Sequence, residues 1–107
     1  MSDEVVLAFS TFPDVQTARR IAGELVTQNF AACANVIPKI ESIYRWQGKI
    51  EKGGETLVLF KTTAARFAAF EEKLKSLHPY DVPEIICTPI ASGWPPYLEW
   101  VRENVRS

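Results

Sequence analysis

The sequence predicts an α+β fold of the split β-α-β kind, with one antiparallel sheet, two helices on one face of it and an extra helix at the carboxyl end. Three observations predict this fold. Apolar runs of strand length alternate with two segments of helical spacing, a glycine-containing turn creates one long hairpin mid-chain, and prolines stand at several boundaries. The 107 residues suit a single domain with one core, residues 1–107.

The first half predicts a strand, a helix and a second strand. Residues 5–12 are a continuous run typical of a central strand. Asp14 is a suitable N-cap for the following helix, which ends near residues 28–29. Residues 30–37 then return as a strand. The apolar residues at helical spacing are Ala18, Ile21, Ala22, Leu25 and Val26.

The middle of the chain predicts a long hairpin. Pro38 has no backbone N–H, so a strand that continues past it needs a bulge or an edge position there. Beyond it, Tyr44 and Trp46 fall on one face, and residues 47–48 form a two-residue turn in which Gly48 takes positive φ. The return strand runs from 49 to 62, and we interpret residues 52–54 as a bulge or a widening of the hairpin.

The second half predicts a helix, a fourth strand and a last helix. Thr63 can cap the helix, and Pro79 ends it. Residues 82–90 form the fourth main strand, with residues 85–87 buried in its middle. Prolines 95 and 96 suit the first turn of the last helix.

Composition narrows the class of protein. The shares of 47% hydrophobic and 23% charged residues are those of a folded globular chain, and a net charge of −1 without a basic run argues against nucleic acid binding. No apolar run reaches the length of a membrane span, and the acidic amino terminus does not resemble a signal peptide, so a cytoplasmic location is expected. Cys33 and Cys87 are expected to be buried free thiols.

Two helices on one face leave the other face of the sheet without a cover, and a bare apolar face indicates assembly. Tyrosine and tryptophan are enriched at contacts between subunits. We therefore expect a homo-oligomer. The large aromatic residues outside the two core helices are Tyr44, Trp46, Trp94, Tyr97 and Trp100.

Five ordered blocks and a carboxyl-terminal one resemble the CutA divalent-cation tolerance family over nearly the whole chain. They are Thr11-Phe12-Pro13-Asp14, Ala31-Ala32-Cys33-Ala34-Asn35, Ser42-Ile43-Tyr44-Arg45-Trp46-Gln47-Gly48-Lys49, Phe60-Lys61-Thr62, His78-Pro79-Tyr80-Asp81-Val82-Pro83-Glu84-Ile85-Ile86 and Tyr97-Leu98-Glu99-Trp100. The resemblance implies a ferredoxin-like domain, a homotrimer whose sheets pack together while the hairpin reaches a neighbour, a similarity to the PII signalling trimer, and a link to copper tolerance. It implies no settled catalytic activity.

The resemblance also bears on metal binding. The copper ligands proposed for some members are a cysteine before the Thr-x-Pro-Asp block and a His-His pair before Pro-Tyr; here these positions hold Ser10, Leu77 and His78. Two of three ligands are absent, and a firm copper or zinc site needs three or four. No cofactor is obligatory, and Cu(II) or another divalent cation is the candidate ligand.

The sequence leaves two interpretations open for several residues. His78 either bonds the last carbonyls of its helix or acts as a metal ligand or cleft residue, with Lys61, Tyr80 and Glu84 at a subunit boundary. Glu84 is otherwise a salt-bridge partner of Lys61 or an edge charge. Cys33 is a packed thiol or a metal ligand. Interface packing is the interpretation for Tyr44, Trp46 and Trp100.

Three classes of function follow. No hydrolase, nucleotide-binding or zinc-protease signature is present, so an enzyme is not expected. A cation-tolerance trimer that acts by weak binding or interaction is the first hypothesis. The alternative is a PII-like trimer that binds a small ligand in clefts between subunits.

Overall fold

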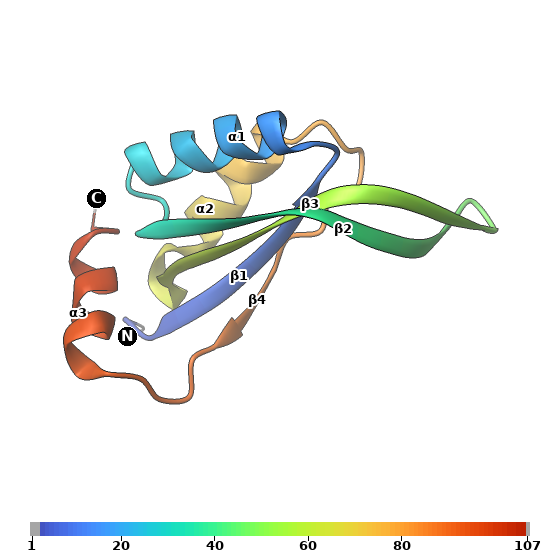
Figure 1. The fold of residues 1–107 in the computed structure, drawn as a ribbon. Coiled ribbons are helices and arrows are strands. Elements are labelled where there is room, and N and C mark those ends of the chain that lie inside the picture. The colour runs from blue at the N-terminus through green and yellow to red at the C-terminus, as the bar shows by residue number, and fades with distance from the viewer. Residues whose placement is uncertain (1–2, 107) are drawn as a thin grey trace.

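The computed structural model describes residues 3–106 and confirms the predicted split β-α-β fold (Figure 1). A four-stranded antiparallel sheet has the order β2-β3-β1-β4. Helices α1 and α2 lie on one face of this sheet, and α3 lies at one end (Figure 1). The elements are β1 (Val5–Phe12), α1 (Val15–Thr27), β2 (Cys33–Trp46), β3 (Lys49–Thr63), α2 (Ala64–Leu77), β4 (Ile86–Pro89) and α3 (Pro95–Glu103).

The main core lies between the sheet and its two helices. Alternate residues of β1 and β3 face the helices, because Ala8 pairs with Phe60 and Phe12 with Thr56. The caps predicted at Asp14 and Thr63 are both formed, by hydrogen bonds to the backbone N–H groups of Thr17 and Arg66. The buried members of this core are Ala8, Phe12, Ala18, Ile21, Ala22, Leu25, Ala31, Val58, Phe60, Phe70 and Leu74.

The long hairpin has the predicted turn and the bulge expected at Pro38, but it lacks the second bulge interpreted at residues 52–54. Gln47 and Gly48 both have positive φ, 51° and 81°, which is the geometry of a tight hairpin turn. The register shifts between Ile37 and Ile40, so Pro38 and Lys39 form the bulge on β2. Residues 52–54 pair continuously within β3, so their interpretation as a bulge is wrong. Pro38 is accommodated both by the bulge and by the edge position of β2.

The fourth strand is shorter than predicted. Only Ile86–Pro89 pair with β1, where a strand over 82–90 was expected. Residues 82–85 remain outside the sheet although β1 continues to Phe12, and the carbonyl of Thr11 accepts a hydrogen bond from the ring of His78 instead of from this segment. Cys87 is exposed and Cys33 half-buried, so the expectation of two buried thiols is wrong, although both are free cysteines. Within residues 3–106, no helix has the length and apolarity needed to span a membrane.

The sheet face opposite α1 and α2 is apolar and mostly uncovered. Helix α3 covers one corner of it, where Val101 and Val105 pack against Val5 and Ala32. Elsewhere on this face Leu7, Phe9, Leu57 and Leu59 are half-buried, Ile37 is 39% exposed and Ile86 is 55% exposed. We call these six residues the open sheet face.

Candidate functional site

His78, the only histidine, ends α2 and is held on both sides of its ring. It is the C-cap of α2, and its backbone N–H donates to the carbonyl of Leu74 at 2.9 Å. Its Nδ1 accepts from the backbone N–H of Tyr80 at 3.2 Å, so its Nε2 carries the proton and donates to the carbonyl of Thr11 at 2.8 Å. The side chain is 8% exposed. His78 therefore joins the end of α2 to the end of β1.

Two aromatic rings enclose this imidazole. The ring of Phe12 stacks on it with centroids 4.7 Å apart, and the ring of Tyr80 lies at 4.8 Å. Burial lowers the pKa of His78 from its usual value, although the Thr11 carbonyl and the charge of Glu55 act in the opposite direction. The neutral form is favoured, with no ring nitrogen free to bind a metal in this arrangement.

Tyr80 links this cluster to the base of the hairpin. Its hydroxyl donates to the Oε2 of Glu55 at 2.6 Å, a charge-assisted bond. Burial, followed by the bond to Glu55, raises the pKa of Tyr80 above its usual value. The segment after α2 is thus fixed to β3. The sequence did not indicate Glu55, because the pairing of β1 with β3, which sets Thr56 opposite Phe12, brings it to this cluster.

Lys61 and Glu84 do not join Tyr80 within one chain. The Lys61 ammonium donates to the side-chain oxygen of Asn35. Lys61 and Glu55 are six residues apart on β3, and strand geometry separates them by about 20 Å. Glu84 is exposed, and no ion pair within residues 3–106 includes it. Within one chain, Lys61 therefore lies far from Tyr80.

Cys33 lies beside Lys61 and α3. Its sulfur is 3.6 Å from the hydroxyl of Tyr97, whose ring stacks on Trp100 at 5.7 Å. Burial and the contact with Cys33 raise the pKa of Tyr97 to about 12. The Cys33 thiol and the Tyr97 hydroxyl therefore lie at the border of the open sheet face.

The three positions compared with copper ligands do not form a donor set. Ser10 is fully buried and its Oγ has no hydrogen-bond partner, while Leu77 packs against the core. Across residues 3–106, no group of three histidine, cysteine, aspartate or glutamate side chains is close enough to hold a metal. These residues do not fit a preformed copper site within one chain.

The aromatic residues predicted at an interface are accessible. Tyr44, Trp46 and Trp100 are 47%, 45% and 42% exposed. Tyr44 pairs with Glu51 and Trp46 with Lys49, so both aromatic side chains share one face of the hairpin, as predicted. The hairpin projects well beyond the two helices (Figure 1). An apolar arm of this kind suits contact with another chain.

The fold and these features define a small ferredoxin-like protein with an apolar sheet face and a projecting hairpin. The sequence model of the CutA1 divalent ion tolerance protein family matches residues 6–104. The chain belongs to this family.

Individual relatives agree with this assignment. The chain is 50% identical over 102 residues to a divalent-cation tolerance protein CutA of Thermus thermophilus, covering 95% of this chain and 97% of that protein. It is 45% identical over 103 residues to the mouse protein CutA, covering 96% of this chain and 58% of the mouse protein. The chain thus spans just over half of that longer relative.

Solved structures are similar over the same length. The Thermus thermophilus divalent cation tolerance protein has a TM-score of 0.93 at 46% identity, covering 95% of this chain and 99% of that one. The protein described as the periplasmic divalent cation tolerance protein CutA of Archaeoglobus fulgidus has a TM-score of 0.92 at 35% identity, covering 95% and 99%.

Proposed function

We propose that this protein acts as a homotrimer in the tolerance of or response to divalent cations, copper among them, through weak binding or interaction rather than catalysis. The open sheet face carries this proposal. Its six apolar side chains lie together on the side that α1 and α2 do not cover, and such a face favours burial against further protein. The resemblance to CutA proteins supports three as the number of subunits.

The surroundings of His78 argue against a strong metal site and against acid–base catalysis. Both ring nitrogens are bonded to backbone groups, and the raised pKa of Tyr80 keeps its hydroxyl protonated near neutral pH. Cation binding by this chain is therefore weak, or it uses ligands from more than one subunit. Two free cysteines suit a reducing compartment, and the cytoplasm is the location that we propose.

A PII-like ligand-binding trimer is the second candidate. The positively charged ammonium group of Lys61 lies at the border of the open sheet face, beside Cys33 and Tyr97. Assembly through this face would put Lys61 of one subunit near a neighbour. Clefts lined by Lys61, Tyr80 and Glu84 from different subunits would then suit a small polar ligand.

Light scattering tests the assembly. We expect the purified protein to have about three times the 12.1 kDa mass of the chain. Leu59→Glu places a charge in the open sheet face and should yield a smaller folded species, whereas Glu72→Gln on the exposed side of α2 should leave the mass unchanged. A wild-type monomer would overturn the proposal.

Calorimetric titration of the metal-free protein with Cu(II) and Zn(II) tests the mode of action. We expect weak heats without a tight one-to-one site per chain. Tight, saturable binding would contradict the weak-binding proposal. Saturable binding of a metabolite without turnover would favour the PII-like candidate.

A further inference from the structure

A hollow of about 430 Å³ opens where the start of α2 meets the end of α3. This volume lies within the range of small-molecule sites. Its lining contains three arginines and one acidic residue, and with Glu99, which pairs with two of these arginines, the local formal charge is +1, although the whole chain has a net charge of −1. The lining residues are Asp3, Thr63, Ala65, Arg66, Arg102, Val105 and Arg106.

Arg66 is fixed in place at one wall of the hollow. Its Nε donates to the carbonyl of Asn29 at 3.2 Å, and its guanidinium lies 4.5 Å from the centroid of the Phe30 ring. These contacts use Nε and the guanidinium face. No hydrogen bond within residues 3–106 uses its two terminal nitrogens, so both can donate to a ligand.

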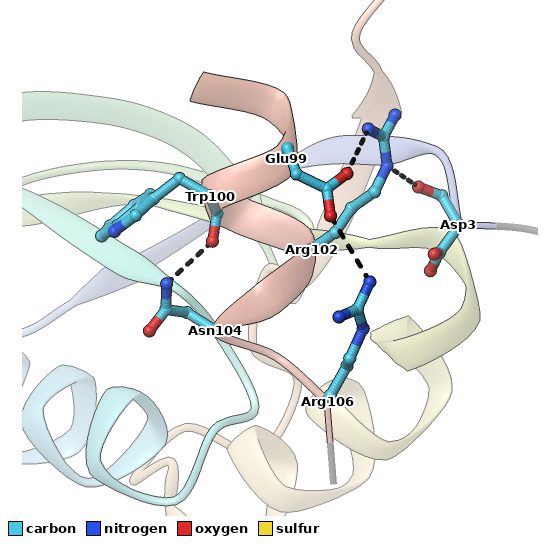
Figure 2. Close-up of polar contacts among 6 residues, drawn as sticks. All are labelled: Asp3, Glu99, Trp100, Arg102, Asn104 and Arg106. Atoms are coloured by element: carbon cyan, nitrogen blue, oxygen red, sulfur yellow. Dashed lines mark hydrogen bonds and ion pairs between the residues drawn. The ribbon is translucent and has the colours of Figure 1, made fainter. Parts of the chain in front are cut away.

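Arg102 and Arg106 also line the hollow, and Figure 2 shows both of them reaching Glu99. The Nε of Arg102 donates to the carbonyl of Asp3 at 2.8 Å, and its Nη1 lies 3.5 Å from Glu99. The Nη2 of Arg106 lies 3.6 Å from the other carboxylate oxygen of Glu99. One carboxylate therefore faces two guanidinium groups, which leaves an excess of positive charge and of N–H donors.

We propose that this hollow binds a small diphosphate, either inorganic pyrophosphate or the diphosphate of a nucleotide. Guanidinium groups match phosphate oxygens with two parallel hydrogen bonds, and several of them together favour a ligand with several negative charges. The start of α2, which adds partial positive charge, also borders the hollow. The hollow is separate from the cluster of His78, Tyr80 and Glu55, and the proposal does not depend on trimer formation.

Titration calorimetry with sodium pyrophosphate at low ionic strength tests this site. We expect saturable binding of one pyrophosphate per chain. Arg66→Gln and Arg106→Gln should each weaken it by roughly tenfold or more, because each removes charge-assisted hydrogen bonds. Arg20→Gln is the matched control, since Arg20 is exposed on α1 next to the cap at Asp14 and does not line the hollow. Circular dichroism checks that each variant is folded, and Arg106 is exposed enough for its substitution to spare the core.

The outcomes distinguish inorganic pyrophosphate from a nucleotide, and specific binding from no binding or diffuse attraction. Equal affinities for ADP and pyrophosphate would support the inorganic ligand, whereas tighter binding of ADP would support a nucleotide. No saturable binding at millimolar pyrophosphate would overturn the proposal. An equal loss in Arg20→Gln and Arg66→Gln would also overturn it, because binding would then be diffuse attraction to surface charge.

Discussion

Ser10 is a buried hydroxyl that the fold leaves without a partner. It is fully buried on the helix-facing side of β1, opposite Val58, and its Oγ is the only buried side-chain nitrogen or oxygen in the described part of the chain without a hydrogen-bond partner. An unsatisfied buried polar group costs about 1–3 kcal/mol, so Ser10→Ala should raise the stability by about 1 kcal/mol. For a domain of this size that gain raises Tm by roughly 4 °C or more.

Thermal unfolding measures this effect at matched protein concentration, since assembly would make Tm depend on concentration. Ser76→Ala is the control because Ser76 is exposed on α2. A lower Tm for Ser10→Ala would show that the hydroxyl is satisfied by a group that the fold does not reveal.

His78 should make the stability depend on pH. Its pKa is lowered from 6.5 in the folded state, so the unfolded chain binds the proton more readily. The stability that the neutral ring contributes is fully present above about pH 6.5 and is lost as the pH falls through that value towards the lower folded pKa. Chemical unfolding from pH 7.5 to 5 measures the loss.

His78→Phe provides the comparison, because it keeps a ring beside Phe12 but cannot titrate. In this variant the free energy of unfolding should change less between pH 6.5 and the pKa that His78 has in the folded protein. It should also cost about 1–3 kcal/mol at pH 7.5, since the Thr11 carbonyl and the Tyr80 N–H lose their partner. An unchanged pH dependence in the variant would assign that dependence to other groups.

At the scale of elements, the hairpin turn depends on Gly48. Its φ of 81° lies in the left-handed region, so Gly48→Ala should destabilise the protein by about 1–2 kcal/mol. Gly53→Ala is a matched control in the same hairpin, because Gly53 lacks positive φ and an added Cβ meets nothing within 4 Å. Chemical unfolding compares the two variants. Equal losses would assign the effect to strand propensity rather than to the turn.

The sequence predicted the elements whose patterns are local. The run at Val5–Phe12, the helical spacing after Asp14 and the turn at Gln47-Gly48 depend on nearby residues, and all three are confirmed. The pairing of β4 stops at Ile86 although β1 continues to Phe12, and beyond Phe9 the Thr11 carbonyl is bonded by His78, which is distant in sequence, so the apolar residues at 82–90 predicted too long a strand. Local patterns set element type, while pairing partners set element length.

The candidate site depends even more than the fold on contacts between residues that are distant in sequence. The end of a helix at His78 followed from Pro79, but the bond between Tyr80 and Glu55 spans 25 residues and depends on the pairing of β1 with β3. The contact between Arg102 and Asp3 joins the two ends of the chain, 99 residues apart. No spacing motif encodes contacts over such distances, so the sequence did not indicate the arginine-lined hollow.

At the scale of the whole molecule, the shape suits an assembly held by an arm and a face. The principal extents are 43 × 26 × 22 Å, and the projecting hairpin contributes to the longest of them (Figure 1). Ile43 and Ile50 lie on the hairpin and are 65% and 58% exposed, so its outer part carries apolar side chains that the chain leaves accessible among charged ones. An arm that buries these residues on a neighbour would complement the open sheet face.

Trp46 is the side chain best suited to test this arrangement. It is 45% exposed near the hairpin tip, where truncation removes no core contact, so Trp46→Ala should weaken assembly more than it unfolds the chain. Loss of an aromatic interface anchor costs about 2 kcal/mol or more, which would raise the dissociation constant at least about thirtyfold. Light scattering over a dilution series measures this shift, and Trp94→Ala is the control because Trp94 is 73% exposed and lies outside the hairpin and the sheet. Unchanged assembly in Trp46→Ala would remove the hairpin from the interface, whereas an equal effect in both variants would place Trp94 in the contact as well.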